Sequence, residues 1–489
     1  MTRAAIALVT LALALPAGAA AGSGFVPTDP LAAKQWYLPA IRAFDSWPDL
    51  PTTLAPVRVA VIDSGLDLDH PEFAGRVAVS RSFVGGDATD HEGHGTFVAG
   101  IIAAAVDNGQ GIAGIAFPAQ LIVAKVVRSD GTISPAAEAR AIRWAADKGA
   151  RVINLSLGGL RAPRDLRQDT YSRAEQDAIA YAYSQGAVVV AAVGNGDQAP
   201  STPWDFASYP AALPHVIGVS AVAQDGSVPI FSNRDLFFND MSAPGVGIIS
   251  TLPRSLTAAR PTCVDQGYSL CGPPDFKSGE GTSYAAAQVS GAAALLLAVR
   301  PTLAPDQVTT LLERTAHDVN AATGCRQCPL LRDRFSGWGE LDIAAALQAL
   351  GGPIPSADRY EGNDDAGPRA FKLWGRSIDV AATVDFWDDQ IDVYKTRLEK
   401  GQTVAASLRG PTGTDMNLVL WRPGTHEVAP RRLSPELEAR RLTQSVHAGA
   451  NEHFLYRARE TGWYYVEVKI AADGSGPYRL HISKSPPGT

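Results

Sequence analysis

The chain has 489 residues, of which 46% are hydrophobic and 19% are charged, and its formal net charge is −7. This length can hold more than one buried core, and the balance of residue types is typical of a folded globular protein and excludes a disordered one. The mild negative charge argues against a nucleic-acid partner, so we expect the protein to bind no nucleic acid.

The first residues predict an export signal. Arg3 precedes an apolar stretch from Ala4 to Leu15, and the small residues over 17–21 fit a small-x-small cleavage site. The apolar stretch is too short to cross a membrane as a helix. We therefore predict a signal peptide over residues 1–21, and a secreted or otherwise extracytoplasmic mature protein with no stable membrane anchor.

The chain contains four cysteines, at positions 263, 271, 325 and 328. Export makes disulfides the expected state, and proximity favours the pairs 263–271 and 325–328, although four cysteines allow three pairings. A redox-active C-x-x-C and a zinc site are the alternatives. Neither is favoured, because no thioredoxin-like βαβ pattern surrounds the motif and no His follows at zinc-finger spacing.

The first half of the chain alternates between strands and helices. Apolar, β-branched runs predict strands at 57–62, 121–127, 152–157, 187–193 and 216–222, and helical patterns lie between them, clearest at 135–148 and 174–185. This alternation predicts an α/β fold, a doubly wound parallel sheet with helices on both faces. Functional sites in such folds gather at the carboxyl ends of strands, where Asp63, Ser156 and Asn195 stand.

A long small-residue helix is predicted from Thr282 to Val299, after Gly279 and Gly281 and before Pro301. It is apolar on most sides, so we expect it to run through the core. Ser283 falls in its first turn, where unpaired N–H groups and the helix dipole favour developing negative charge. That position suits a nucleophile, although a Gly-Thr-Ser alone would also fit an ordinary helix cap.

The composition changes after residue 350, which divides the chain into a domain over 22–350, a linker and a second domain. The linker is the Gly- and Pro-rich stretch 351–357. Beyond it, alternating runs separated by Gly-, Pro- and Asp-rich turns predict a smaller all-β sandwich over 358–489. The predicted strands are 377–384, 391–398, 403–408, 417–421, 463–470 and 478–482.

Three other motifs carry groups that could act with Ser283. Asp63 begins a D-S-G at the end of a buried strand, His94 lies in H-G-T-F-V-A-G at the start of a helix, and Asn195 ends A-A-V-G-N. A serine nucleophile needs a base, the base needs a carboxylate, and the oxyanion needs hydrogen-bond donors. Singly, Asp63 also fits a strand-end cap and Asn195 a turn residue.

A metal site is an alternative use of the segment around His94. Asp90, His91 and His94 are three ligand types close together. We rank this interpretation lower because the hydrolytic set already accounts for His94. Asp90 and His91 are then expected to be solvated loop residues.

Taken together, the motifs D-S-G, H-G-T-x-V-A-G, A-A-x-G-N and G-T-S-x-A resemble the signatures of the subtilisin-like serine proteases, in their order and spacing, over about residues 30–350. The resemblance implies that Asp63 orients His94, that His94 is the general base and then acid, and that Ser283 is the nucleophile. It also implies an oxyanion hole made by the Ser283 N–H and the Asn195 side chain.

The same resemblance implies where substrate binds. The substrate-binding strand corresponds to Ser156, Leu157 and Gly158, and an extended peptide would pair with it. Ala192 and Gly194 belong to the wall of the primary specificity pocket, which Ser208 could close as a floor. This pocket is expected to be apolar and uncharged.

The function implied is that of a secreted, monomeric serine endopeptidase that acts on polypeptides and needs no cofactor for its chemistry. A binding or adhesion protein with an inactive peptidase half, and an esterase or transacylase using the same triad, are the alternatives. Two residues depart from the family pattern: Ala287 replaces a usual Pro, and Phe97 a frequent second His. The stretch from Asp29 to Trp36 resembles a mature N-terminus, so we expect no large pro-domain.

The second domain resembles the pre-peptidase C-terminal domain of secreted proteases, over about residues 356–485. Some members of that family bind calcium or matrix polymers. Oxygen ligands for a structural calcium ion are available in its acidic loops. The candidate ligands are Glu361, Asn363, Asp364, Asp389 and Asp392, and a solvated acidic edge is the equal alternative.

Overall fold

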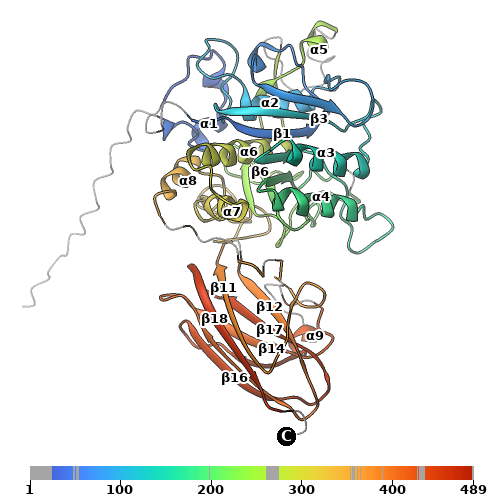
Figure 1. Ribbon diagram of the computed structural model, residues 1–489. Coiled ribbons are helices and arrows are strands. Elements are labelled where there is room, and N and C mark those ends of the chain that lie inside the picture. Colours follow the sequence, from blue (N-terminus) through green and yellow to red (C-terminus); the bar gives the residue numbers. More distant parts are fainter. Residues whose placement is uncertain are drawn as a thin grey trace, which may run out of the picture.

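The computed structural model describes residues 25–47, 50, 54–197, 199–259, 275–352, 354, 358–360, 362–363, 365–387, 389–426, 428 and 435–486. The predicted signal peptide, Cys263, Cys271 and most of the predicted linker lie outside these residues. Figure 1 shows an α/β domain followed by a separate all-β domain, drawn below it in orange and red.

A seven-stranded parallel sheet forms the centre of the α/β domain. Its strands, in spatial order, are β2 (Val77–Ser82), β3 (Ala119–Lys125), β1 (Val57–Asp63), β4 (Val152–Leu155), β5 (Val188–Ala192), β6 (Val216–Val222) and β7 (Met241–Pro244). Five of these strands were predicted. Two strands were not predicted: β2 alternates between half-buried and exposed positions, and β7 has only four residues.

Helices cover both faces of this sheet, as a doubly wound fold requires. One core joins the sheet to α2 (His94–Ala103), α6 (Thr282–Val299), α7 (Pro305–Arg314) and α8 (Ile343–Ala349). A second core, on the opposite face, joins it to α3 (Pro135–Asp147) and α4 (Arg173–Ser184). The smaller elements are α1 (Tyr37–Ala40), α5 (Arg254–Ala259), β8 (Ile248–Thr251) and β9 (Phe276–Gly279).

Helix α6 runs through the core, as its composition predicted. Within the described residues it is the one helix long and apolar enough to cross a membrane, and 89% of that window is buried inside the domain. Its contacts with β1, β4, β5, β6 and β7 identify it as the central packing element of the domain.

The chain order of the sheet reverses between β1 and β4, which are neighbours although β2 and β3 lie between them in sequence. Strands on either side of such a switch point send their following loops in opposite directions, which opens a crevice at their carboxyl ends. Asp63 ends β1 at this crevice. The strand predicted at 152–157 ends at Leu155. Residues 156–158 follow it, beyond the carboxyl end of β4 and on the same side of the sheet as the crevice.

The second domain is a sandwich of two antiparallel-dominated sheets. One has the order β10 (Phe371–Leu373), β12 (Ile391–Leu398), β17 (Gly462–Ile470), β14 (Met416–Trp421) and β15 (Arg441–Ser445). The other has the order β11 (Ser377–Asp385), β18 (Ser475–Lys484), β13 (Thr403–Arg409) and β16 (Asn451–Arg457), and a short helix α9 spans Pro435–Glu438.

The two domains meet on the side away from the crevice. Trp338 donates from its indole nitrogen to the carbonyl of Trp387 at 3.0 Å, and its ring packs against Phe386. A cavity of about 230 Å³ at this junction is lined by residues of α7, by the first residues of β5 and β6, and by residues of the sandwich. The disulfide Cys325–Cys328 is formed, as predicted.

Candidate active site

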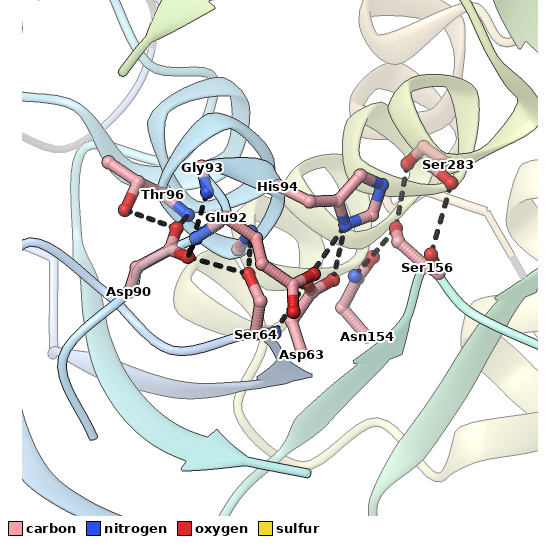
Figure 2. Close-up of polar contacts among 11 residues, drawn as sticks. Asp63, Ser64, Asp90, Glu92, Gly93, His94, Thr96, Asn154, Ser156 and Ser283 are labelled. Atoms are coloured by element: carbon pink, nitrogen blue, oxygen red, sulfur yellow. Dashed lines mark hydrogen bonds and ion pairs between the residues drawn. The ribbon is translucent and has the colours of Figure 1, made fainter. Parts of the chain in front are cut away.

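The Asp63 carboxylate and the His94 imidazole form the centre of the site. Asp63 is 1% exposed at the end of β1, and His94 is the first residue of α2. His94 Nδ1 lies 2.8 Å from Asp63 Oδ1 and 2.9 Å from Oδ2. A carboxylate at Nδ1 favours the tautomer with its proton there and leaves Nε2 able to accept a proton. Figure 2 shows the ring between Asp63 and Ser283.

Two hydrogen bonds tie Ser283, in the first turn of α6, to Ser156. The Ser283 hydroxyl donates to the Ser156 carbonyl at 3.0 Å, and the Ser156 hydroxyl donates to the Ser283 carbonyl at 2.7 Å (Figure 2). The Ser283 hydroxyl donates to Ser156 and not to His94, so it has to turn toward His94 before it can give its proton to the imidazole. A hydrogen bond between a reacting hydroxyl and its base often forms only when substrate is bound.

A buried polar chain below these residues fixes β4 to α6. The Asn154 amide donates to the Ser156 hydroxyl at 2.9 Å and accepts from the Ser290 hydroxyl at 2.8 Å. Asn154 and Ser290 are both fully buried. These two residues were not singled out from the sequence, although polar side chains inside an apolar strand and an apolar helix were a usable signal.

The Asn195 side chain is oriented by the residue before the serine. Its Oδ1 accepts from the backbone N–H and from the hydroxyl of Thr282, each at 2.9 Å. The Thr282 hydroxyl also accepts from the Gly194 N–H at 3.2 Å. With the amide oxygen occupied in this way, Asn195 turns its NH₂ group away from Thr282, where it can donate to another acceptor.

A cleft of about 290 Å³ joins the predicted residues into one site. All the predicted site residues except Asp63, which lies behind His94, line this cleft: His94, Ser156, Leu157, Gly158, Ala192, Gly194, Asn195 and Ser283. Ser208, the predicted pocket floor, lines it too, and receives a hydrogen bond from the Asn233 amide at 3.2 Å. Gly159 pairs with Tyr209 across one side of the cleft.

Comparison with known proteins gives this arrangement a family. A family model described as the Subtilase family matches residues 55–339, which is more than half of the chain. The chain belongs to the subtilase family. It is therefore a subtilisin-like serine endopeptidase, a hydrolase whose substrates are polypeptides.

Individual relatives agree with this assignment. Thermitase of Thermoactinomyces vulgaris is 35% identical over 276 residues, which cover 56% of this chain and 85% of thermitase. Subtilisin DY of Bacillus licheniformis is 37% identical over 296 residues, which cover 60% of this chain and 92% of subtilisin DY. The solved structure of Sphericase has a TM-score of 0.51 at 29% identity and covers 64% of this chain and 99% of Sphericase.

The electrostatics around His94 in this subtilase favour its charged form. Burial lowers the pKa of His94, but the negative charges of Asp63, Asp90 and Glu92 and the hydrogen bond to Asp63 more than offset it, so the pKa lies above the ordinary value for imidazole. An imidazolium is the state that a general base reaches after it takes a proton. The site therefore stabilises the proton-bearing His94.

Asp90 has a role that was not predicted from the sequence. It was expected to be a solvated loop residue, but it is fully buried and accepts five hydrogen bonds from Ser64, Glu92, Gly93 and Thr96. An Asp that accepts from backbone N–H groups two and three residues later is a common turn motif, and this pattern could have predicted part of the network.

The two residues that depart from the family pattern lie on the helices α2 and α6. Phe97 is fully buried, and its ring packs at 4.3 Å between centroids against Tyr284 of α6. Ala287 is fully buried in the first part of α6, which continues without interruption from Thr282 to Val299. Hence both residues belong to the buried core of this subtilase.

The described side chains form no metal-binding cluster. No group of three or more His, Cys, Asp or Glu residues in this part of the chain could hold a metal ion. The alternative set of Asp90, His91 and His94 is therefore rejected, since the Asp90 carboxylate is already surrounded by donors. Of the predicted calcium ligands, Glu361 and Asp364 lie outside the described residues, so calcium binding by the sandwich stays a prediction.

Proposed function

We propose that this subtilase is a secreted enzyme that hydrolyses peptide bonds through a triad of Asp63, His94 and Ser283. The observation that carries the proposal is the His94 ring, held at Nδ1 by both oxygens of a buried carboxylate and lying between that carboxylate and Ser283. A hydroxyl at the start of a buried helix then has a base beside it and a helix N-terminus behind it.

In the first half of the reaction, the Ser283 oxygen attacks the carbonyl carbon of the substrate while His94 Nε2 takes its proton. The carbonyl oxygen becomes an oxyanion, and the Asn195 amide and the Ser283 N–H donate to it. One such side-chain donor contributes roughly 10²- to 10³-fold in subtilisin, a family relative from which this value is taken. His94 then protonates the leaving amine as the C–N bond breaks.

The second half repeats these steps with water. The acyl group is now an ester on Ser283, and His94 takes a proton from the water as it attacks. The ester bond to Ser283 breaks, the carboxylic acid leaves, and the proton returns to the Ser283 oxygen. In our proposal the peptide lies extended along residues 156–158, and Ala192, Gly194 and Ser208 contact the side chain that precedes the cut.

Labelling with a fluorophosphonate, followed by intact mass measurement and a casein assay, tests this function. We expect one covalent adduct on the wild-type protein, casein hydrolysis, and the loss of both in Ser283→Ala. A protein that takes no label would be a binding protein, and one that takes label and cleaves esters but not casein would be an esterase. Undiminished proteolysis by Ser283→Ala would contradict the triad.

Secretion is supported by the signal-like residues 1–21 and by the Cys325–Cys328 disulfide, since disulfides persist outside the cytoplasm. Expression of the full chain in a secreting host, with mass spectrometry of the protein in the medium, tests it. We expect a mature N-terminus close to residue 22. A product that stays in the cytoplasm with its first residues intact would contradict secretion.

A further inference from the structure

The Asp90 carboxylate is buried beside the triad without touching the cleft. Its Oδ1 accepts from the Ser64 hydroxyl at 2.8 Å, from the Glu92 N–H at 3.0 Å and from the Gly93 N–H at 2.9 Å. Its Oδ2 accepts from the backbone N–H and the hydroxyl of Thr96, at 2.9 and 2.7 Å. Figure 2 shows these donors arranged around one carboxylate.

These hydrogen bonds cap the helix that carries His94. The N-cap residue of α2 is Gly93, which has no side chain to accept from the first turn. The free N–H of Thr96 bonds instead to Asp90, and that of Gly95 bonds to the Ser64 hydroxyl at 2.8 Å. A carboxylate at a helix N-terminus also interacts favourably with the helix dipole. Asp90 and Ser64 therefore define where α2 begins.

The same bonds connect this helix end to the end of β1. Ser64 follows Asp63 directly, and its hydroxyl both donates to Asp90 and accepts from Gly95. The two segments are in close contact, because a Cβ on Gly95 would lie 2.3 Å from the Gly65 carbonyl oxygen and 3.2 Å from the Asp63 Cβ. A small movement of the first turn of α2 thus changes the distance between Asp63 and His94.

We propose that Asp90 is a positioning residue for the reaction, which acts through Ser64 and the first turn of α2 to hold His94 against Asp63. It touches neither substrate nor the reacting atoms, so it is not a catalytic residue. The proposal rests on the proposed function, since positioning His94 matters for rate only if His94 is the base.

The charge of Asp90 adds a second effect on His94. The other ionisable groups that face His94 are Asp63 of β1, Glu92 of the preceding loop, and Tyr284 of α6, whose ring lies 5.9 Å away between centroids. Lys125 of β3 faces Glu92 and donates to the Thr89 carbonyl. Since Asp90 is one of the charges that raise the pKa of His94, its neutralisation lowers that pKa.

The test compares Asp90→Asn with Ser64→Ala. For Asp90→Asn we expect kcat to fall on the order of 10- to 100-fold, the size of effect that a small misplacement of a catalytic group produces. We also expect the acid limb of the kcat/KM profile to move to lower pH. Ser64→Ala breaks the link between Asp90 and Gly95 but keeps the charge, so kcat falls while the acid limb stays in place.

Asp333→Asn is the matched control. Asp333 is 3% exposed and accepts from the Phe335 N–H at 2.6 Å and the Ser336 N–H at 2.9 Å, in a loop that does not line the cleft. This control should lower the melting temperature and leave kcat and the acid limb unchanged. A folded Asp90→Asn enzyme with the wild-type kcat and acid limb would overturn the proposal, and so would an Asp333→Asn enzyme with the same losses.

Two further measurements keep the test decisive. If Asp90→Asn does not fold, Ser64→Ala decides, and a folded Ser64→Ala enzyme with the wild-type kcat overturns the proposal. If the wild-type protein cleaves no peptide, the proposed function fails, but the His94 ring can still be titrated by ¹H–¹⁵N NMR in Ser283→Ala. A His94 pKa that Asp90→Asn leaves unchanged in that background would then overturn the role of Asp90.

Discussion

Polar side chains are buried both beside the cleft and inside the β-sandwich. The two regions differ in whether those side chains keep a donor or acceptor atom that is not used in a hydrogen bond within the protein. Beside the cleft, Asp63 holds one nitrogen of His94 and leaves the other facing Ser283. In the sandwich, Tyr394 and Tyr478 join their hydroxyls at 2.6 Å, and Tyr478 donates to Asp392 at 2.5 Å. These three side chains link the two sheets.

The difference separates the proposed active site from a structural cluster. Burial raises the pKa values of Tyr394 and Tyr478 well above that of an ordinary tyrosine, so their hydroxyls stay protonated and serve only as hydrogen-bonding groups. His94, in contrast, keeps a nitrogen that can take and return a proton, and Asn195 keeps an NH₂ group aimed away from Thr282. Unused hydrogen-bonding capacity that faces a cleft, more than burial itself, marks the chemistry in this molecule.

The largest expected effect comes from changing a buried Asp to Asn, once beside the cleft and once in the β-sandwich. Asp63→Asn should lower kcat by about 10⁴-fold, because His94 would lose its tautomer and its counter-charge. This is roughly the loss caused by removing the triad aspartate in subtilisin, and by the same Asp→Asn change in the unrelated trypsin-type proteases. Asp392→Asn should leave kcat unchanged and lower the free energy of unfolding by about 1–3 kcal/mol. Active-site titration, steady-state kinetics and urea unfolding measure these effects, and a strong loss of kcat in Asp392→Asn would break the comparison.

The buried carboxyl pair Glu138 and Glu175 tests whether the catalytic domain also holds purely structural polar groups. The two side chains lie on α3 and α4, hydrogen-bond to each other, and are each 4% exposed. Burial raises the pKa of both, and for Glu138 the neighbouring charge of Glu175 raises it further. One carboxyl therefore keeps a proton that joins the two helices.

Stability should then fall as pH rises. A raised pKa means that the folded state binds this proton more tightly than the unfolded state, in which it leaves near pH 4.5. The stabilisation is full below that pH and is lost as pH rises through the raised pKa. Glu138→Gln keeps a donor and cannot ionise. Between pH 5 and 9 the free energy of unfolding should therefore fall less in Glu138→Gln than in its parent, by about 1 kcal/mol or more.

Urea unfolding in a Ser283→Ala background, which prevents autolysis, measures this difference. Glu399→Gln, at an exposed position of the sandwich, is the control and should follow the parent at every pH. Parallel pH curves for Glu138→Gln and its parent would show that the pair holds no shared proton.

Much of the fold could be predicted because its signals are local. The strands around Asp63 and Asn195 are continuous apolar runs, and α6 is apolar on nearly every side. The residues of each element are therefore enough to predict both its secondary structure and its burial. Strands β2 and β7 carried no such signal, because β2 alternates between half-buried and exposed positions and β7 has only four residues. Pairing with β3 and β6 holds these two strands in the sheet.

The site divides in the same way. The predicted residues lie at the end of a strand, in the few residues after it, or at the start of a helix, and parallel topology brings those ends together. The turn pattern at Asp90 could predict its bonds to the Glu92 and Gly93 N–H groups, but the bonds from Ser64 and Thr96 depend on how the folded chain packs. The Asn154 and Ser290 pair likewise requires that β4 and α6 be packed side by side.

The smallest expected effect concerns Ala287, where the family usually has Pro. Ala287 lies four residues after Ser283, so its N–H is the natural helical donor to the Ser283 carbonyl, which also accepts from the Ser156 hydroxyl. Pro at this position removes that N–H and crowds the carbonyl, which releases the first turn of α6 to adjust around Ser283. We therefore expect Ala287→Pro to raise the rate of peptide hydrolysis by less than about tenfold, or about 1.4 kcal/mol in the barrier.

Ala287→Val adds bulk but keeps the N–H, so it should not accelerate the reaction. Equal or lower turnover in a folded Ala287→Pro enzyme, measured with one peptide substrate after active-site titration, would show that an uninterrupted helix already positions Ser283 well.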